Sequence, residues 1–289
     1  MKLATAPVNW NNGDVTDYRP WVPYPALLDE MVAAGYVATE WGMNMERETA
    51  KLRSDLQQRS LQMLGGFVGL ELRNRQKREA EIARAVAIGR FFQSAGGGYL
   101  IAADSGDDRR RGEAGHVDAS GALTDDQWKS LGTGLNDLAK ELASIGVRVV
   151  FHNHVGTYVE TEEETTRLLD ETDPELVSWC LDCGHLAYGG GDNLRALKKY
   201  GNRVGYVHIK DVDGQVFKES RENGWSFAQA LKSYIFAPLG EGIARVPDVI
   251  DSLRQAGYNG WLVVEQDTTP DDPTQIAANN RRYLEPLIT

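Results

Sequence analysis

Residues 147–185 read VRVVFHNHVGTYVETEEETTRLLDETDPELVSWCLDCGH and form one complete strand–helix–strand pattern. Val147–His152 and Val177–Asp182 are short apolar runs of the kind that buried parallel strands show. Between them, Thr161 is followed by three glutamates, a capping-box pattern that predicts the start of a helix. Ionisable side chains stand where each strand ends. The unit therefore predicts both a fold and the place of a site within it.

The same alternation of apolar runs and amphipathic segments continues along the whole chain. The other predicted strands are Leu3–Trp10, Tyr36–Trp41, Met63–Leu70, Gly98–Ala103, Val204–Ile209 and Trp261–Glu265. Amphipathic helices with the i, i+3, i+4 spacing are predicted at Pro25–Ala34, Ala80–Phe92, Asp126–Ile145 and Val246–Ala256. A (β/α)8 TIM barrel, one α/β domain over residues 1–289, accommodates these units best.

A doubly wound open sheet is the alternative fold, but the glycines do not favour it. Gly96–Gly98 precedes a strand instead of following one, and Gly189–Gly191 lacks the spacing of a dinucleotide-binding loop. Two long polar segments, near 104–120 and 213–240, interrupt the regular pattern, the second with a short helix predicted around Phe227–Tyr234. We expect both to lie as loops over the mouth of the barrel.

The composition excludes several kinds of partner. The chain has 289 residues and a formal net charge of −11. Without a basic surface we expect no binding to nucleic acid or to anionic membranes. The sequence shows neither a signal-peptide core nor an apolar stretch of about 20 residues, so the cytoplasm is the expected location. Barrels of this kind often pair through their mouths or helices, and a homo-oligomer is therefore among the expected states.

The histidines and acids gather at predicted strand ends, which meet at one mouth in a closed parallel barrel. These residues are His152, His154, Asp182, His185, His208 and Glu265. Any one of these histidines could be structural, but such a cluster is rare outside functional sites. Imidazole and carboxylate together suit a divalent transition metal. In strand seven, His208 and Lys210 point to the same side by the two-residue period of a strand.

Several motifs carry a family resemblance over essentially the whole chain. They are APVNW at 6–10, TEWG at 39–42, FHNHVGT at 151–157, LDCGH at 181–185, VHIKD at 207–211 and GWLVVEQD at 260–267. With them the chain resembles the xylose-isomerase-like barrel superfamily and, within it, the inosose dehydratases (2-keto-myo-inositol dehydratases). The resemblance implies a lyase of inositol catabolism that acts on a small polyhydroxylated carbonyl compound.

The resemblance also implies one divalent metal ion, with Mn or Co foremost and Zn or Fe as alternatives. In the superfamily the metal is held by a Glu after strand five, an Asp after strand six, a His after strand seven and a Glu after strand eight. Asp182, His208 and Glu265 match the last three positions. The first position departs from the pattern, because this chain has His152 there. We favour Glu160 as the remaining ligand, with His152 as the alternative.

The implied reaction is a dehydration through an enediolate. His152 or His154 is expected to remove the proton next to the carbonyl. Lys210 and His185 are expected to stabilise oxyanions or to bind hydroxyls. The remaining two residues of the expected site line the sugar pocket, and they are Trp10 and Glu40.

Three other functions fit the same fold. A ketose isomerase or epimerase would use the same enediolate and conserve mass. A phosphodiesterase acting at abasic DNA would need additional metal ligands and a basic surface, against a net charge of −11. A sugar-binding barrel without turnover would retain the residues but hold no tightly bound metal.

Overall fold

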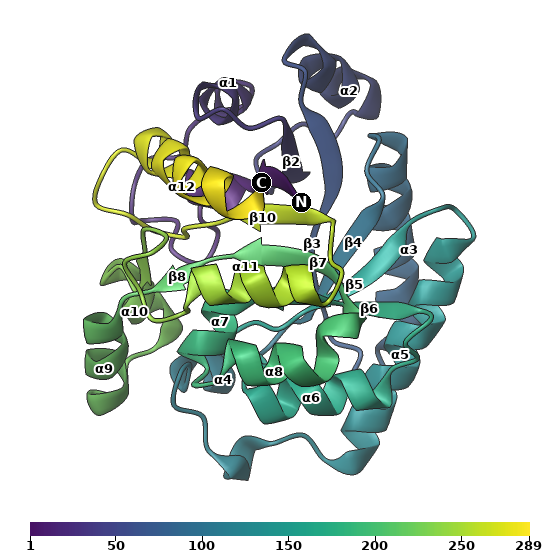
Figure 1. Cartoon of the computed structure of the whole chain (residues 1–289). Helices are drawn as coiled ribbons and strands as arrows, with labels where there is room; N and C mark the ends of the chain where they lie inside the picture. The colour runs from purple at the N-terminus through teal and green to yellow at the C-terminus, as the bar shows by residue number, and fades with distance from the viewer.

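The structure is a computed structural model and describes residues 1–289, apart from the side chain of Ala119. Parallel strands close a barrel in the order β1-β10-β7-β6-β5-β4-β3-β2, with helices around it (Figure 1). The barrel strands are β1 Lys2–Thr5, β2 Ala38–Trp41, β3 Gln62–Leu70, β4 Tyr99–Asp104, β5 Arg148–His152, β6 Val177–Asp182, β7 Val204–Ile209 and β10 Trp261–Val264. The predicted (β/α)8 barrel is confirmed.

Helices connect successive strands on the outside of the barrel. They are α1 Ala26–Ala33, α2 Thr49–Gln58, α3 Arg78–Ser94, α5 Asp125–Ala143, α6 Glu162–Glu171, α8 Asn193–Tyr200, α11 Val246–Gln255 and α12 Pro273–Ile288. The capping box predicted at Thr161 is present, with its hydroxyl accepting from the amide of Glu164. Among the described residues, no helix combines the length and the apolar character needed to cross a bilayer.

The two long segments contain more regular structure than the sequence predicts. Segment 104–120 carries α4 Asp108–Gly112 and a 3-10 turn, Ala119–Gly121. Segment 213–240 follows the short strand β8 Asp211–Val212 and contains α9 Gly214–Glu222, α10 Phe227–Lys232 and β9 Phe236–Ala237. A further short helix, α7 Cys183–Tyr188, follows β6 directly, and the carboxylate of Asp182 caps it by accepting from the amide of His185 at 2.7 Å.

Each strand of the barrel contributes to one apolar layer in the interior. Its strand residues are Ala4, Ala38, Leu64, Ile101, Val150, Cys180, Tyr206 and Val263. Side chains two residues further along a strand point to the same side. The next layer therefore begins with Glu40, His152, Asp182, His208 and Glu265, at the carboxyl ends of the strands. The fold places these polar residues directly above a closed apolar floor.

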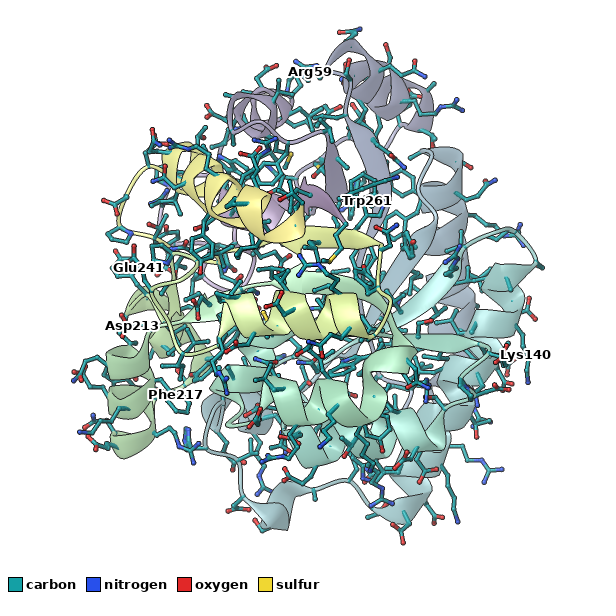
Figure 2. All side chains as sticks on the ribbon, in the orientation of Figure 1. Arg59, Lys140, Asp213, Phe217, Glu241 and Trp261 are labelled. Carbon is teal, nitrogen blue, oxygen red and sulfur yellow. The ribbon has the colours of Figure 1, made fainter. Side chains whose placement is uncertain are left out.

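The two ends of the barrel differ. In Figure 1 the arrows of β7 and β10 point to the side where α9 and α10 lie. Figure 2 shows Asp213, Phe217 and Glu241 on that side, whereas Trp261 marks the amino end of β10. The segments that surround the site thus follow the carboxyl ends of the strands, as the βα loops of such barrels do.

Close strand packing predicts one sharp stability effect. A methyl group at Gly65 in β3 would lie 2.0 Å from the carbonyl oxygen of Tyr99 in β4, whereas one at Gly98 would meet nothing within 4 Å. We expect Gly65→Ala to lower the free energy of unfolding by about 2 kcal/mol or more, since a main-chain oxygen cannot move aside. Gly98→Ala is the matched control and should change it by under about 0.5 kcal/mol. Urea unfolding measures both, and equal values for the two variants would contradict the packing.

Candidate active site

Four side chains from four strand ends converge at the mouth of the barrel. His152, Asp182, His208 and Glu265 each offer one ligand atom, and these atoms all lie within 4.8 Å of one another. The Nε2 atom of His152 is 3.0 Å from Nδ1 of His208 and 3.5 Å from Oδ2 of Asp182. Oε2 of Glu265 lies 3.2 Å from the same Nδ1 atom. All four residues are buried.

The arrangement fits a divalent cation. Oδ2 of Asp182 is buried and, among the described residues, accepts no hydrogen bond. Besides Asp182 and Glu265, the carboxyl groups of Glu40 and Asp267 are also buried here. Lys210 forms ion pairs with Asp182, Glu265 and Asp267. Burying so many acids costs free energy unless cations compensate them. The mixture of imidazole and carboxylate suits Mn, Fe, Co or Zn.

Glu40 orients one of the histidines from behind. Its Oε1 atom lies 2.8 Å from Nε2 of His208 and accepts a hydrogen bond from the hydroxyl of Tyr206 at 3.0 Å. This contact turns Nδ1 of His208 toward the other ligand atoms, as carboxylates do behind metal-binding histidines. Burial alone would lower the pKa of His208, but Glu265 and Glu40 raise it well above its ordinary value. The surroundings of this histidine are therefore strongly negative.

Lys210 lies beside the four-residue group and forms its shortest ion pair with Asp267, a residue that the sequence did not predict in the site. Its Nζ atom is 2.7 Å from Oδ1 of Asp267, 3.1 Å from Oε2 of Glu265 and 3.2 Å from Nε2 of His185. Burial would lower the pKa of Lys210, but the nearby carboxylates raise it well above its ordinary value. Lys210 is therefore a buried ammonium group that faces the cavity.

His154 and His185 stack on each other at the edge of this group. Their ring centroids are 3.9 Å apart, with an angle of 32° between the planes. Nδ1 of His154 lies 2.7 Å from the carbonyl oxygen of Val155, to which it donates, so Nε2 carries the free lone pair. Burial and the neighbouring His152 lower the pKa of His154 to about 4. The geometry leaves His154 as a neutral imidazole with an open acceptor.

A cavity of about 280 Å³ lies over these residues and is lined by side chains of two kinds. The ionisable ones are His152, His208, His154, His185, Lys210, Glu40, Glu265, Asp267 and Asp14. The apolar ones include Pro7, Val8, Trp21, Trp41, Met43 and Phe67. One face of a ring could contact apolar side chains while its oxygens meet polar groups.

Comparisons with known proteins agree with this geometry. The model of the xylose isomerase-like TIM barrel family matches residues 28–287. The chain belongs to this family. Similarity extends over the full length of the inosose dehydratase of Geobacillus thermodenitrificans, with 34% identity over 98% of this chain and 96% of that protein. The inosose dehydratase of Geobacillus kaustophilus is 32% identical over 100% of this chain and 95% of that protein.

A solved structure of similar fold is that of the IOLI protein with a bound zinc atom. It has a TM-score of 0.75 and 15% identity, and covers 100% of this chain and 98% of that one. At this identity the likeness concerns the fold alone.

In this family member, Glu160 does not join the four-residue group, contrary to the sequence-based expectation. Its carboxylate is buried and accepts hydrogen bonds from the amides of Gly115 at 2.8 Å and Gly156 at 2.6 Å. These amides belong to two different loops, so Glu160 ties the segment after β4 to the segment after β5. His152 occupies the strand-five position in the group instead.

Trp10 does not line the cavity either. The side chain is 1% exposed and donates from Nε1 to the hydroxyl of Thr274 at 2.8 Å, within the core against α12. The physical reason is that β1 ends at Thr5, and a 3-10 turn, Pro7–Asn9, then redirects the chain. From that turn, Pro7 and Val8 line the cavity instead. The cavity is also lined by five residues that the sequence predicts in the site: Glu40, His152, His154, His185 and Lys210.

The pKa of Glu160 predicts a pH-dependent stability. Burial raises this pKa to about 7, against the opposing effects of the two backbone amides and Arg110, while Glu164 raises it further. Because the folded-state pKa lies above the unfolded one, the protonated group stabilises the fold below about pH 4.5, and this contribution is lost as the pH rises through about 7.

We therefore expect the wild type to lose more stability than Glu160→Gln between about pH 5 and 8.5. The difference should be about 2.5 kcal/mol, from 1.36 kcal/mol per pKa unit over the part of the shift that titrates between these two pH values. Urea unfolding of both proteins at the two pH values measures it. Parallel pH profiles for the two proteins would contradict the assignment.

Proposed function

We propose that the protein is a metal-dependent dehydratase that removes water from a cyclic polyol ketone such as 2-keto-myo-inositol. The observation that carries the proposal is the juxtaposition of the four-residue group with Lys210 and His154 in one cavity. Full-length similarity to proteins named inosose dehydratase supports the choice of reaction. A hydro-lyase on this barrel is therefore the function we assign.

The proposed metal ligands are His152, Asp182, His208 and Glu265. His152 replaces Glu160 in the proposal because its Nε2 atom lies in the group, whereas the oxygens of Glu160 are occupied by backbone amides. We propose Mn or Co first, with Zn and Fe as alternatives that the same ligands accept. The IOLI protein, whose structure has a similar fold, binds a zinc atom, which is consistent with a divalent metal in this proposal.

The apolar and polar lining residues of the cavity suit an inosose ring. Its carbon–hydrogen face would lie on Trp21, Met43 and Phe67, and its oxygens would face Lys210 and His185. The segments near 104–120 and 213–240 complete this mouth in the proposal. The second segment contributes Phe227, whose ring centroid lies 5.6 Å from that of His154.

The chemistry of the chain follows from these positions. When bound, a divalent metal would supply positive charge that polarises the ketone oxygen. Nε2 of His154 accepts the proton from the carbon next to the ketone. The ammonium group of Lys210, held by Asp267, donates a hydrogen bond to the oxygen that gains negative charge. The β-hydroxyl then takes up the removed proton as its carbon–oxygen bond breaks, so one water leaves and His154 is neutral again.

An epimerase or isomerase remains the alternative on the same residues. A structure of L-ribulose 3-epimerase has a TM-score of 0.74 but only 15% identity, so its likeness concerns the fold alone. Epimerisation returns the proton to carbon and keeps the β-hydroxyl. The mass of the product therefore separates the two reactions.

Replacing the proposed base tests the function directly. With metal and 2-keto-myo-inositol, the wild type should form a product lighter by one water, detected by mass spectrometry. His154→Gln should retain metal and fold but lower kcat by about 100-fold or more, as expected for a lost general base. Ser105→Ala, outside the main cavity, is the control. Product of unchanged mass, or full activity of His154→Gln, would overturn the assignment.

Metal content tests the proposed ligand set. We expect about one divalent ion per chain in the wild type and in Glu160→Gln, because the Glu160 carboxylate is bound to amides. His152→Gln should weaken metal binding by about 10-fold or more, since an imidazole ligand is lost. Elemental analysis after dialysis at matched free metal measures all three proteins. Loss of metal in Glu160→Gln with retention in His152→Gln would restore Glu160 as the ligand.

A further inference from the structure

A second cavity of about 160 Å³ adjoins the main one. Three residues line both cavities: Asp14, Phe67 and His154. The second cavity, here called the side cavity, extends from them toward the ends of β3 and β4. Apart from Phe227, which belongs to the proposed mouth, its other lining residues have no role in the proposed dehydration. The side cavity thus adjoins the proposed active site at three shared side chains.

Glycine and main-chain atoms keep the side cavity open. Gly69 and Gly156 line it, and Gly156 has a φ of 75°, a conformation that side chains rarely adopt. A Cβ atom at Gly156 would also come within 3.4 Å of Arg111. The two glycines thus contribute only main-chain atoms to the lining of the side cavity.

The polar groups of the side cavity match hydroxyls rather than one net charge. Arg111 donates from Nη1 to the carbonyl oxygen of Ser105 at 3.0 Å, and among the described residues it forms no ion pair. Asp14 likewise forms none within the described part of the chain. A guanidinium group donates only and a carboxylate accepts only, whereas a hydroxyl does both. The pair therefore suits a neutral group that carries several hydroxyls.

The size and the aromatic side chains point to a ring. A cavity of about 150 Å³ encloses a six-membered ring such as benzene. The side cavity, of about 160 Å³, therefore has room for the ring atoms of a sugar, whose hydroxyls would extend to its polar lining. Phe67 lines both cavities and is 45% exposed, and Phe227 also lines the side cavity. An exposed aromatic residue among hydrogen-bonding groups is suited to the apolar face of a polyhydroxylated ring.

We propose that the side cavity is a subsite for a second polyhydroxylated ring, joined through oxygen to the keto ring in the main cavity. The protein would then accept glycosylated cyclic polyols as well as the free ring. This inference rests on the proposed function for the identity of the first ring only. Independently of that identity, we infer that Arg111, Asp14 and Phe67 bind the attached ring.

Calorimetry on metal-loaded protein tests the subsite without requiring turnover. The probes are a galactosyl-myo-inositol, myo-inositol and free galactose. We expect wild type to bind the galactosyl compound about 10-fold more tightly than myo-inositol, a difference of about 1.4 kcal/mol. Ser105→Leu should fill the side cavity and abolish that difference while leaving the affinity for myo-inositol unchanged. Arg111→Met, which keeps an unbranched apolar stem but removes the guanidinium group, should reduce the difference by about 3-fold or more.

The outcomes separate the subsite from the proposed reaction. Equal or weaker binding of the galactosyl compound by wild type would overturn the subsite, even if 2-keto-myo-inositol is dehydrated. A tenfold preference that survives both substitutions would overturn it as well, since the ring would then bind elsewhere. Failure to dehydrate 2-keto-myo-inositol, with the preference present and removed by Ser105→Leu, would overturn the reaction and retain the subsite. Thermal unfolding checks that both variants are folded.

Discussion

The two-residue period of strands in a closed parallel barrel is the constraint on which the site depends. Val150, Cys180, Tyr206 and Val263 fill one interior layer, and each is followed two residues later by a polar side chain. Those four side chains are the proposed metal ligands. Their convergence within 4.8 Å therefore requires no special loop, because strand direction and register already bring them together.

The cost of this arrangement is electrostatic. Acids buried above an apolar floor need compensation, and the chain supplies it with Lys210, His208 and hydrogen bonds from Tyr206. Buried ion pairs and hydrogen bonds also fix the loops at the mouth of the barrel. Arg110 is fully buried and binds Glu164 at 2.8 Å and the carbonyl oxygen of Thr157 at 2.6 Å. Charged groups thus hold the mouth in place while the proposed reacting groups stay open to the cavity.

Much of this could be predicted from the sequence, because strand ends are a local property. The strand boundaries at Val177–Asp182 and Val204–Ile209 are as predicted, and Asp182, His208 and Glu265 lie where a strand-end argument puts them. Asp267 was within reach of the same argument, since it follows Glu265 by one strand period. Its 2.7 Å contact with Lys210 makes it part of the site.

The positions that the sequence does not predict depend on contacts between residues far apart in the chain. Nothing near Glu160 in the sequence indicates that the amide of Gly115, in another loop, binds its carboxylate. The strand predicted over Leu3–Trp10 ends at Thr5, because a 3-10 turn at Pro7–Asn9 sends the indole of Trp10 into the core. The side cavity depends on loops that are far apart in sequence, from Asp14 to Phe227, and no motif marks it.

The proposed dehydration depends on one divalent metal held by the four-residue group. Anomalous diffraction from crystals grown with Mn²⁺, recorded on both sides of the manganese absorption edge, would locate that metal. We expect a single peak bounded by Nε2 of His152, Nδ1 of His208 and the carboxylates of Asp182 and Glu265. A peak against Glu160, or none at full metal occupancy in solution, would contradict it.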